Sequence, residues 1–325
     1  MHTLSRRTAL AAGASLALAA PALGQPQQAM RFLIGFAAGG PTDQVARLAA
    51  PGFAEALGQQ VVVENRTGAA GNIATEAVAR AAPDGQTLMV ANVGQITINP
   101  HTYDRMPADP MADLVPIAMM TATGVLMVAH NSLGVSTLGE LTALLRREPG
   151  RHKYATSGAG GIVHVVMELW KQRARVETEA VHYRGAAAAV PDVLAARTPV
   201  FMDTFILLEP HMRAQNPAIR PLFHTAAQRS PAMPAVPVAR EAGLEDFVFP
   251  NWFGLFAPRG TPPAVVARLV EANRRALGVA SVRERLEAGA MQIVADGPDE
   301  FRSYLQREHQ AYGEVIRAAG IRADG

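Results

Sequence analysis

Cysteine is absent from this chain of 325 residues. Its absence excludes disulfide bonds, thiolate metal sites, a cysteine nucleophile and a lipid attached to an N-terminal cysteine. Long apolar runs are also missing, because no run beyond the N-terminal segment reaches the roughly 20 residues of a membrane-spanning helix. A chain of this length has enough residues for two domains, whose cores make disulfide bonds unnecessary.

A clustered basic face is missing too, although the pI is 9.2. The chain has 30 Lys and Arg residues against 28 Asp and Glu residues, and removal of Arg6 and Arg7 with a leader leaves 28 of each. The mature chain is therefore near neutral. Because a nucleic-acid-binding protein should present a basic surface, we expect no nucleic-acid partner.

The sequence motifs of common enzymes are absent as well. Residues 157–160 do not fit the G-x-S-x-G nucleophile elbow, and no G-x-x-x-x-G-K-[ST] phosphate loop is present. The glycine-rich residues 158–163 lack the last glycine of a dinucleotide fingerprint. The nine histidines include no H-E-x-x-H motif and no pair spaced four residues apart. We therefore expect no metal, no cofactor and no enzymatic activity.

Residues 1–24 have the pattern of an export signal. Arg6 and Arg7 are the paired arginines of a twin-arginine signal, a short Ala- and Leu-rich core follows, and residues 22–24 are small enough for cleavage. An amphipathic helix of the mature fold is the alternative, but the segment has no polar face. We expect a soluble periplasmic protein from which this signal has been cleaved.

Beyond the leader, the sequence alternates short β-like runs with helical ones. This alternation predicts right-handed βαβ units and an α/β fold with mainly parallel sheets and flanking helices. Two long extended runs, residues 116–129 and 249–258, are long enough to cross between domains. We expect one domain from residues 29–127 plus 251–325 and a second from residues 128–250, with a ligand cleft between them.

The first strand-to-helix turn covers residues 36–43, Phe-Ala-Ala-Gly-Gly-Pro-Thr-Asp. An apolar strand ends there in small residues and two glycines, and Pro41 suits the first position of the following helix. The free N–H groups of this helical turn and the positive end of the helix dipole favour an anion. An ordinary turn without a ligand is the alternative.

Two later turns, at residues 156–161 and 183–186, repeat this design. A cleft lined by helix N-termini from both domains would bind a carboxylate through main-chain N–H groups and hydroxyls, without a buried lysine or arginine. Thr42, Thr156 and Ser157 are candidate hydroxyl donors, and the alternative for each is an N-cap.

Three more residues have both a functional and a structural interpretation. Asp43 falls in the first helical turn, where a favourable interaction with the helix dipole is enough to explain an acidic residue without any contact to a ligand. His164 either points into the cleft from the first turn of its helix or packs there. Trp252, on the second extended run, is either a stacking platform or part of the core or hinge packing.

Several motifs together resemble one family, the periplasmic substrate-binding components of tripartite tricarboxylate transporters, often called Bug receptors. The resemblance covers nearly the whole mature chain. Its marks are FAAGGPTD at 36–43, VVENRTGAAGN at 62–72, APDG at 82–85, INP at 98–100, YRGA at 183–186, WFGL at 252–255 and AAGI at 318–321.

The resemblance implies a Venus-flytrap, type II periplasmic-binding-protein fold that closes on a small organic acid. In such receptors the first βα turn binds one carboxylate, partly through ordered waters, and the middle domain covers the other end of the ligand. Val163 and residues 197–199 depart from the family pattern, so the identity of the acid stays open. With His164 included, the candidate ligand-binding residues are Phe36, Ala38, Gly39, Gly40, Thr42, Asp43, Thr156, Ser157, Gly158, His164, Tyr183, Arg184, Gly185, Ala186 and Asp203.

Three functions are compatible with these observations. The first is a receptor, expected as a monomer, that delivers a carboxylate to the integral-membrane permease subunits of a transporter. The second is a receptor that presents its ligand to a sensor protein, and nothing in the sequence separates it from the first. The third is an exported α/β hydrolase, which the missing nucleophile and metal motifs disfavour.

Overall fold

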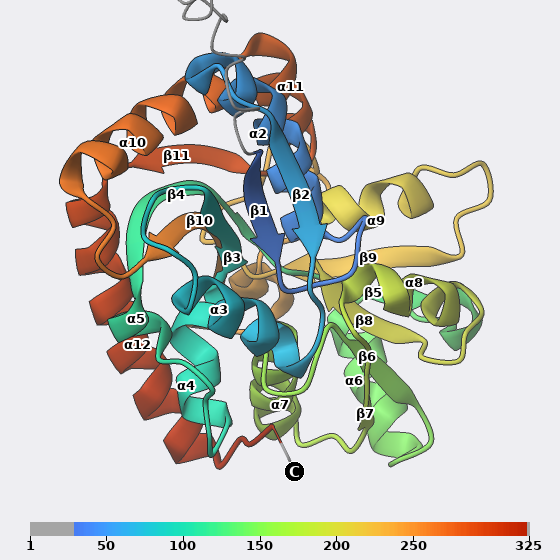
Figure 1. Cartoon of the computed structure of the whole chain (residues 1–325). Helices are drawn as coiled ribbons and strands as arrows, with labels where there is room; N and C mark the ends of the chain where they lie inside the picture. Colours follow the sequence, from blue (N-terminus) through green and yellow to red (C-terminus); the bar gives the residue numbers. More distant parts are fainter. Residues whose placement is uncertain (1–28, 324–325) are drawn as a thin grey trace, which may run out of the picture.

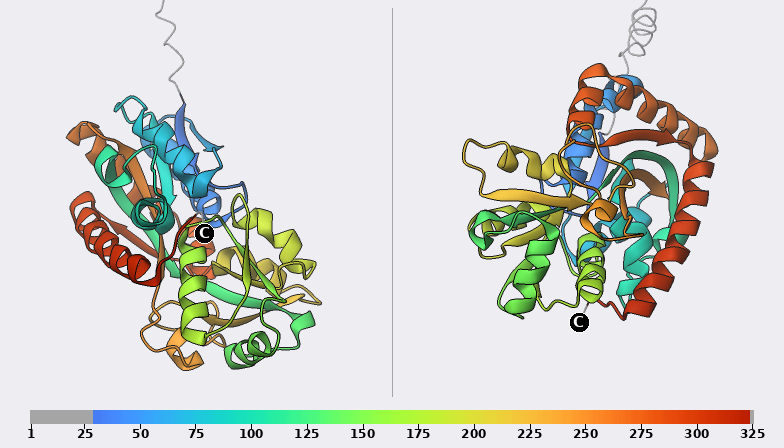
Figure 2. Two further views of the ribbon diagram at one scale, coloured as in Figure 1. Left: turned by 90° about the horizontal axis from the view of Figure 1, so that it is seen from below. Right: turned by 180° about the vertical axis from the view of Figure 1, so that it is seen from behind.

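The computed structural model describes residues 29–323, and the predicted export signal at residues 1–24 lies outside the described residues. The chain forms two lobes, each with a β-sheet that has helices on both faces (Figure 1). The first lobe contains both ends of the described chain, and the second contains its middle part (Figure 2). The two-lobed α/β arrangement expected from the sequence is therefore confirmed.

The sheet of the first lobe has the strand order β11-β4-β10-β3-β1-β2, and that of the second lobe has the order β7-β6-β8-β5-β9. The strands of the first sheet are β1 (Met30–Ile34), β2 (Val61–Asn65), β3 (Thr87–Asn92), β4 (Leu114–Gly124), β10 (Pro250–Pro258) and β11 (Gln292–Asp296). Those of the second sheet are β5 (Leu126–His130), β6 (Lys153–Thr156), β7 (Glu179–His182), β8 (Val200–Asp203) and β9 (Ile219–His224).

Both sheets are mixed, so the expectation of mainly parallel sheets is wrong. In the first sheet β1 pairs in parallel with β2 and β3, whereas β10 runs antiparallel to β3 and β4, and β11 runs antiparallel to β4. In the second sheet β6 is parallel to β7 and β8, whereas β5 is antiparallel to β8 and β9. The physical reason is that β4 leads the chain out of the first lobe and β10 brings it back in the opposite direction.

Helices of the first lobe pack on the two faces of its sheet, α2, α10 and α11 on one face and α3 and α12 on the other. In the second lobe α6 and α7 cover one face and α8 and α9 the other. The helices are α2 (Pro41–Leu57), α3 (Asn72–Ala79), α4 (Asn99–Thr102), α5 (Pro110–Asp113), α6 (Leu138–Arg147), α7 (Ile162–Ala174), α8 (Ala186–Leu194), α9 (Phe205–Met212), α10 (Pro263–Gly278), α11 (Ala280–Ala288) and α12 (Pro298–Ala319). Shorter helical turns are η1 (Ala69–Gly71), the π-helix η2 (Gly94–Ile98), η3 (Asn131–Leu133) and η4 (Ala239–Ala242).

The two lobes share a continuous apolar core where the chain crosses between them. A single residue, Val125, separates β4 from β5, and it belongs to the same buried cluster as Trp170 of α7 and Trp252 of β10. Trp252 is fully buried, so its expected role in core packing is confirmed. The C-terminal end of α12 also contacts the second lobe, because Gln172 donates a hydrogen bond to the Ala319 carbonyl at 2.9 Å.

Candidate functional site

A small cavity lies between the lobes, and we call it the interlobe cavity. Its volume is about 20 Å³, close to the space that one water molecule requires. Its lining comes from both lobes and consists of Phe36, Pro41, Thr42, Asn92, Asn251 and Phe253 from the first and Ser157, Ile162, Ala186 and Asp203 from the second. A second space of about 210 Å³, here called the side cavity, adjoins it and shares Phe36 and Ser157.

Three helices begin at the interlobe cavity. Their first residues, Pro41 of α2, Ile162 of α7 and Ala186 of α8, all line it. The N-cap positions of these helices are glycines, and no side chain caps the N–H groups of the first turns. Uncapped first turns with aligned helix dipoles favour a negatively charged group at this position.

The N-cap interpretation of Thr42, Thr156 and Ser157 is wrong, because glycines occupy the N-cap positions of α2 and α7. Thr42 is 2% exposed and lines the interlobe cavity, and Ser157 lines both cavities. Thr156 has a local role: its hydroxyl accepts a hydrogen bond from the Gly158 N–H at 3.3 Å and lies 2.7 Å from Nδ1 of His182.

The turn at residues 36–43 is stabilised by the Asp43 carboxylate, which is 2% exposed. Oδ2 accepts hydrogen bonds from the Gly39 N–H at 2.9 Å and from Nε of Arg47 at 2.8 Å, and Oδ1 accepts one from Nδ2 of Asn65 at 2.9 Å. Burial disfavours the charged form, but these three hydrogen bonds outweigh it and lower the pKa of Asp43. Asp43 does not line either cavity, and its observed contacts are those of a residue that shapes the turn.

The glycines and alanine of this turn have different surroundings. Ala38 and Gly39 are exposed, and Gly39 has a φ of 80°. Gly40 is the buried N-cap of α2 and has an ordinary extended backbone. Asn65 supports the turn a second time by donating to the Phe36 carbonyl at 3.0 Å.

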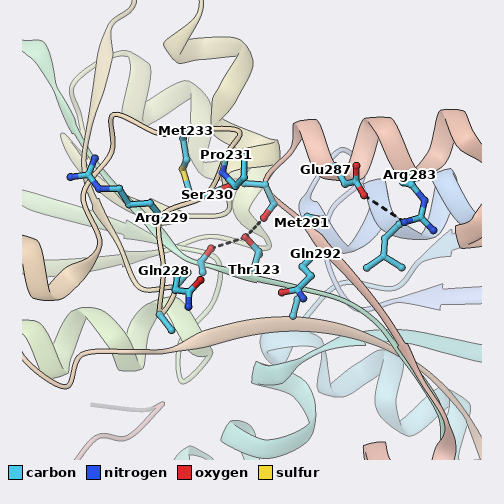
Figure 3. Close-up of a pocket in the computed structure, with 16 residues that line it drawn as sticks. Thr123, Gln228, Arg229, Ser230, Pro231, Met233, Arg283, Glu287, Met291 and Gln292 are labelled. Atoms are coloured by element: carbon cyan, nitrogen blue, oxygen red, sulfur yellow. Dashed lines mark hydrogen bonds and ion pairs between the residues drawn. The ribbon is translucent and has the colours of Figure 1, made fainter.

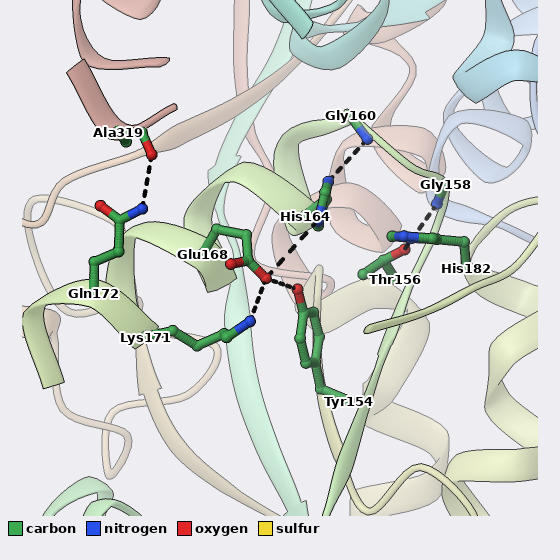
Figure 4. A network of polar contacts seen from close by, with 10 residues as sticks. All are labelled: Tyr154, Thr156, Gly158, Gly160, His164, Glu168, Lys171, Gln172, His182 and Ala319. Atoms are coloured by element: carbon green, nitrogen blue, oxygen red, sulfur yellow. Dashed lines mark hydrogen bonds and ion pairs between the residues drawn. The ribbon is translucent and has the colours of Figure 1, made fainter. Parts of the chain in front are cut away.

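Behind the turn at residues 156–161 lies the polar network of Figure 4. His164 is 5% exposed, and its Nδ1 atom accepts a hydrogen bond from the Gly160 N–H at 3.0 Å. Its ring meets that of His182 edge-on at 4.8 Å, and Glu168 lies on its other side, 3.9 Å from Nε2. Burial lowers the pKa of His164 to about 4, so the ring is neutral and can accept this hydrogen bond at neutral pH. His164 lines neither cavity, which favours its packing role.

The turn at residues 183–186 brings the second lobe close to the first. Tyr183 and the exposed Arg184 line the side cavity, and the Tyr183 hydroxyl donates to Asp192 at 2.7 Å. Gly185 has a φ of 114°, and a Cβ atom there would lie 2.8 Å from the Ala37 main-chain nitrogen of the other lobe. A glycine is therefore required at this contact between the lobes.

Asp203 lies at the end of β8 and lines the interlobe cavity. Burial raises the pKa of its carboxyl group to about 7, although the main-chain N–H and the hydroxyl of Thr204 both donate to it. The sequence did not indicate Asn92, Asn251 or Phe253 as lining residues. Asn92 is the last residue of β3, and Asn251 is the second residue of β10, next to Trp252. A polar residue near the end of a strand was the only signal in the sequence.

A third cavity measures about 710 Å³ and lies where the lobes join, between the end of β4, β11, α11 and the loop at residues 226–233 (Figure 3). Its arginines are paired, Arg229 with Glu241 at 2.9 Å and Arg283 with Glu287 at 3.7 Å.

Within residues 29–323, no group of three acidic or histidine side chains could bind a metal ion. No helix in this part of the chain is long and apolar enough to cross a membrane.

Comparisons with known proteins agree with this architecture. Residues 45–321 match the family model described as "Tripartite tricarboxylate transporter family receptor". The solved structure of the periplasmic binding protein BugD has a TM-score of 0.87 and 27% identity, and the match covers 92% of this chain and 99% of BugD. These matches confirm the expected periplasmic-binding-protein fold.

Two solved structures of relatives were determined with ligands. Rpa4515 of R. palustris with adipate has a TM-score of 0.87 and 31% identity, and the match covers 91% of this chain and 99% of that one. MatC (Rpa3494) of Rhodopseudomonas palustris with bound malate has a TM-score of 0.85 and 31% identity, and the match covers 90% of this chain and 100% of MatC. The chain therefore belongs to the receptor family of tripartite tricarboxylate transporters, a family of solute-binding proteins rather than enzymes.

Proposed function

We propose that this protein binds a small organic carboxylate between its lobes and delivers it to the integral-membrane permease subunits of a tripartite tricarboxylate transporter. The observation that carries this proposal is the meeting of three uncapped helix N-termini, those of α2, α7 and α8, at one cavity. Such an arrangement stabilises a carboxylate through main-chain N–H groups. Relatives solved with adipate and with malate support the same ligand class.

Within this proposal, the hydroxyls of Thr42 and Ser157 donate to the ligand beside the first turns of the helices. No described residue forms a hydrogen bond with either hydroxyl, and both residues line the interlobe cavity. Arg184 lines the side cavity, where its positive charge attracts a second carboxylate of a longer ligand. Three further residues act indirectly, through hydrogen bonds to main-chain N–H groups that maintain the turns at residues 36–43 and 156–161. They are Asp43, Thr156 and His164.

Ligand entry requires the lobes to separate, because the interlobe cavity is too small for an organic acid. The moving bodies are residues 29–124 plus 250–323 and residues 126–249, because β5 pairs within the second sheet and β10 within the first, which shifts the predicted boundaries slightly. They turn about the two crossings, where β4 meets β5 and where β10 begins. Small-angle scattering with and without a verified ligand tests this motion, and an unchanged radius of gyration would contradict it.

The first test of the ligand class is a thermal-shift screen of mono-, di- and tricarboxylates. A ligand at 100 times its dissociation constant stabilises the folded state by about 2.7 kcal/mol. Ala186→Leu places bulk in the cavity and should abolish the shift, whereas Ala188→Leu, at an exposed position of the same helix, should retain it. If both variants are folded and both keep the full thermal shift, the ligand does not bind in the interlobe cavity.

The export route and the partner are part of the proposal. The arginine pair at Arg6 and Arg7 supports twin-arginine export of the folded protein, with cleavage near Gly24. Mass spectrometry of the periplasmic protein should show an N-terminus near Gln25, and an intact leader would contradict this. Crosslinking in intact cells should capture the permease subunits in a ligand-dependent manner, and capture of a sensor kinase instead would contradict the transport role.

A further inference from the structure

Two side chains of the first lobe donate hydrogen bonds directly to the main chain of the second lobe. Thr102 is the last residue of α4, and Tyr103 follows it. The Thr102 hydroxyl donates to the Gly160 carbonyl at 3.1 Å. The Tyr103 hydroxyl donates to the Ala159 carbonyl at 2.9 Å. Both carbonyls belong to the turn at residues 156–161, which leads into α7, and we call this pair of hydrogen bonds the interlobe clasp.

The donors of the interlobe clasp are fixed within the first lobe. Thr102 is 1% exposed, and its carbonyl accepts a hydrogen bond from the Ala323 N–H at 2.9 Å. The Tyr103 N–H donates to the Asn99 carbonyl at 3.0 Å. Asn99 is fully buried and donates through Nδ2 to Oδ1 of Asn72 at 2.6 Å. Because these hydrogen bonds all lie within one lobe, we expect α4 to move with the first lobe when the lobes separate.

The acceptors of the interlobe clasp belong to the peptide groups that precede α7. The carbonyl of the peptide group between Ala159 and Gly160 accepts the hydrogen bond from Tyr103. The N–H of the same peptide group donates to Nδ1 of His164 at 3.0 Å (Figure 4). The helix α7 begins soon afterwards at Ile162, which lines the interlobe cavity. The orientation of this peptide group therefore sets the direction in which the free N–H groups of the first turn of α7 point.

The turn and the first lobe fit together without space for a larger residue. Gly160 has a φ of 74°, and a Cβ atom there would lie 2.6 Å from the Thr102 hydroxyl oxygen. A Cβ atom on Gly158 would lie 3.3 Å from Cα and Cβ of Ala70, a residue of the first lobe. Two segments that must separate for ligand entry are therefore in direct contact beside the interlobe cavity. Their hydrogen bonds exist only while the lobes are together.

We infer that Thr102 and Tyr103 are positioning residues for ligand binding, and that the interlobe clasp increases affinity without contact with the ligand. The inference rests on the proposed function and assigns part of the binding free energy to two residues that bind no part of the ligand. Thr102 lines neither cavity. Tyr103 lines the side cavity, but its hydroxyl donates to a main-chain carbonyl of the opposite lobe.

The interlobe clasp acts on the balance between the open and the closed receptor. The apparent affinity of a receptor falls with the fraction of molecules that can adopt the binding form. The clasp stabilises the closed form, so its loss lowers that fraction by the same factor whichever acid is bound. Contacts of the closed form must break before the ligand leaves, whereas the ligand enters the open form, in which the clasp is absent. The clasp therefore slows dissociation and leaves association nearly unchanged.

The experiment compares three variants by isothermal titration with acetate, succinate, malate, adipate and citrate. Tyr103→Phe and Thr102→Val each remove one hydroxyl of the interlobe clasp and keep the shape of the side chain. Thr142→Val is the matched control, because the Thr142 hydroxyl donates to the Leu138 carbonyl at 2.8 Å within α6. For every acid that the wild type binds, each clasp variant should lose about three- to tenfold in affinity, by the same factor for each acid. Thr142→Val should retain the affinity of the wild type.

Stopped-flow fluorescence separates the rate of ligand uptake from the rate of release. Trp170 and Trp252 are the two tryptophans of the chain, and both lie in the apolar core that the lobes share, where their fluorescence should report closure. The clasp variants should release the ligand about three- to tenfold faster than the wild type. Their association rates should stay within about twofold of the wild-type value. A role only in the folding of the turn would instead slow association.

Unchanged affinity in either folded clasp variant would overturn the inference and leave the proposed function standing. A loss that differs between acids would also overturn it, because the altered residue would then contact the ligand. So would a loss that arises from slower association with an unchanged dissociation rate. Absence of binding by the wild type to every acid would overturn the proposed function together with the inference.

Discussion

The indole N–H of Trp252 donates a hydrogen bond to Oε2 of Glu308 at 2.7 Å, and this contact joins α12 to β10, a strand that lines the interlobe cavity. The Glu308 carboxylate also accepts from the Thr97 hydroxyl at 2.9 Å and the Tyr304 hydroxyl at 2.8 Å. Trp252 stands between Asn251 and Phe253, which both line the interlobe cavity. One buried carboxylate of α12 therefore positions β10 and η2 beside the site.

The first prediction concerns this carboxylate. Burial raises the pKa of Glu308 from 4.5 to about 7, despite the three donors. A carboxyl group whose folded-state pKa is raised contributes stability at low pH that is lost as the pH rises through the folded-state value. Glu308→Gln should therefore gain stability relative to the wild type between pH 4.5 and pH 7, by at most about 3 kcal/mol.

Urea unfolding at several pH values measures this difference. Asp203, whose pKa is raised to about 7 as well, contributes in the same direction but is present in both proteins. Glu314→Gln, at an exposed position of α12, is the control and should follow the wild type at every pH. A constant difference between Glu308→Gln and the wild type across this range would show that Glu308 is not the group that titrates.

The second prediction concerns the approach of the two lobes. Gly185→Ala places a Cβ atom 2.8 Å from the Ala37 nitrogen, so the lobes should be unable to close fully. We expect ligand affinity to fall at least tenfold. Gly243→Ala is the control, because Gly243 also has a positive φ, 87°, but no atom within 4 Å of the added Cβ. Titration of both variants with an acid found in the screen measures their ligand affinities. Equal losses of affinity in the two variants would show that backbone strain, and not the contact with Ala37, is responsible.

The third prediction concerns the turn at residues 36–43. Asn65→Ala removes a donor to Asp43 and another to the Phe36 carbonyl, and should cost about 1–3 kcal/mol of stability. Arg47→Ala removes a partner of Asp43 whose side chain is 51% exposed, and should cost less. Chemical denaturation gives the two values, and a larger loss in Arg47→Ala would show that the ion pair, not the amide, maintains the turn.

The fourth prediction concerns His164. A histidine whose folded-state pKa is lowered to about 4 destabilises the protein as the pH falls below its ordinary value of 6.5, because the unfolded chain then binds the proton more tightly. His164→Asn retains an acceptor near the Nδ1 position for the Gly160 N–H and has no proton to bind. The variant should lose less stability than the wild type between pH 6.5 and pH 4.

Acid unfolding followed by circular dichroism checks this difference. His211→Asn, at the end of α9, serves as the matched control and should show the acid sensitivity of the wild type. If His164→Asn and the wild type lose stability in parallel, another group is responsible for the acid sensitivity.

The local turns were predictable because their signals lie within a few residues of each other. Two glycines and Pro41 after an apolar run specify a strand end and a helix start, and the structure has β1 ending at Ile34 and α2 beginning at Pro41. Strand direction was not predictable in this way, since an extended run has the same residue pattern whether it pairs in parallel or antiparallel. β11 was missed for a related reason: its short polar-edged sequence becomes a strand only by pairing with β4.

The sequence by itself determined the family, the two-lobed α/β fold and the turns from which a ligand site could be built. The tertiary structure decided which residues meet there. Asn251 reaches the cavity because β10 inserts between β3 and β4, more than a hundred residues away in the chain, and Asp43 and His164 are directed into hydrogen bonds behind their turns. A side chain's neighbours depend on such long-range pairing, whereas helix starts and turns depend on the conformational preferences of adjacent residues.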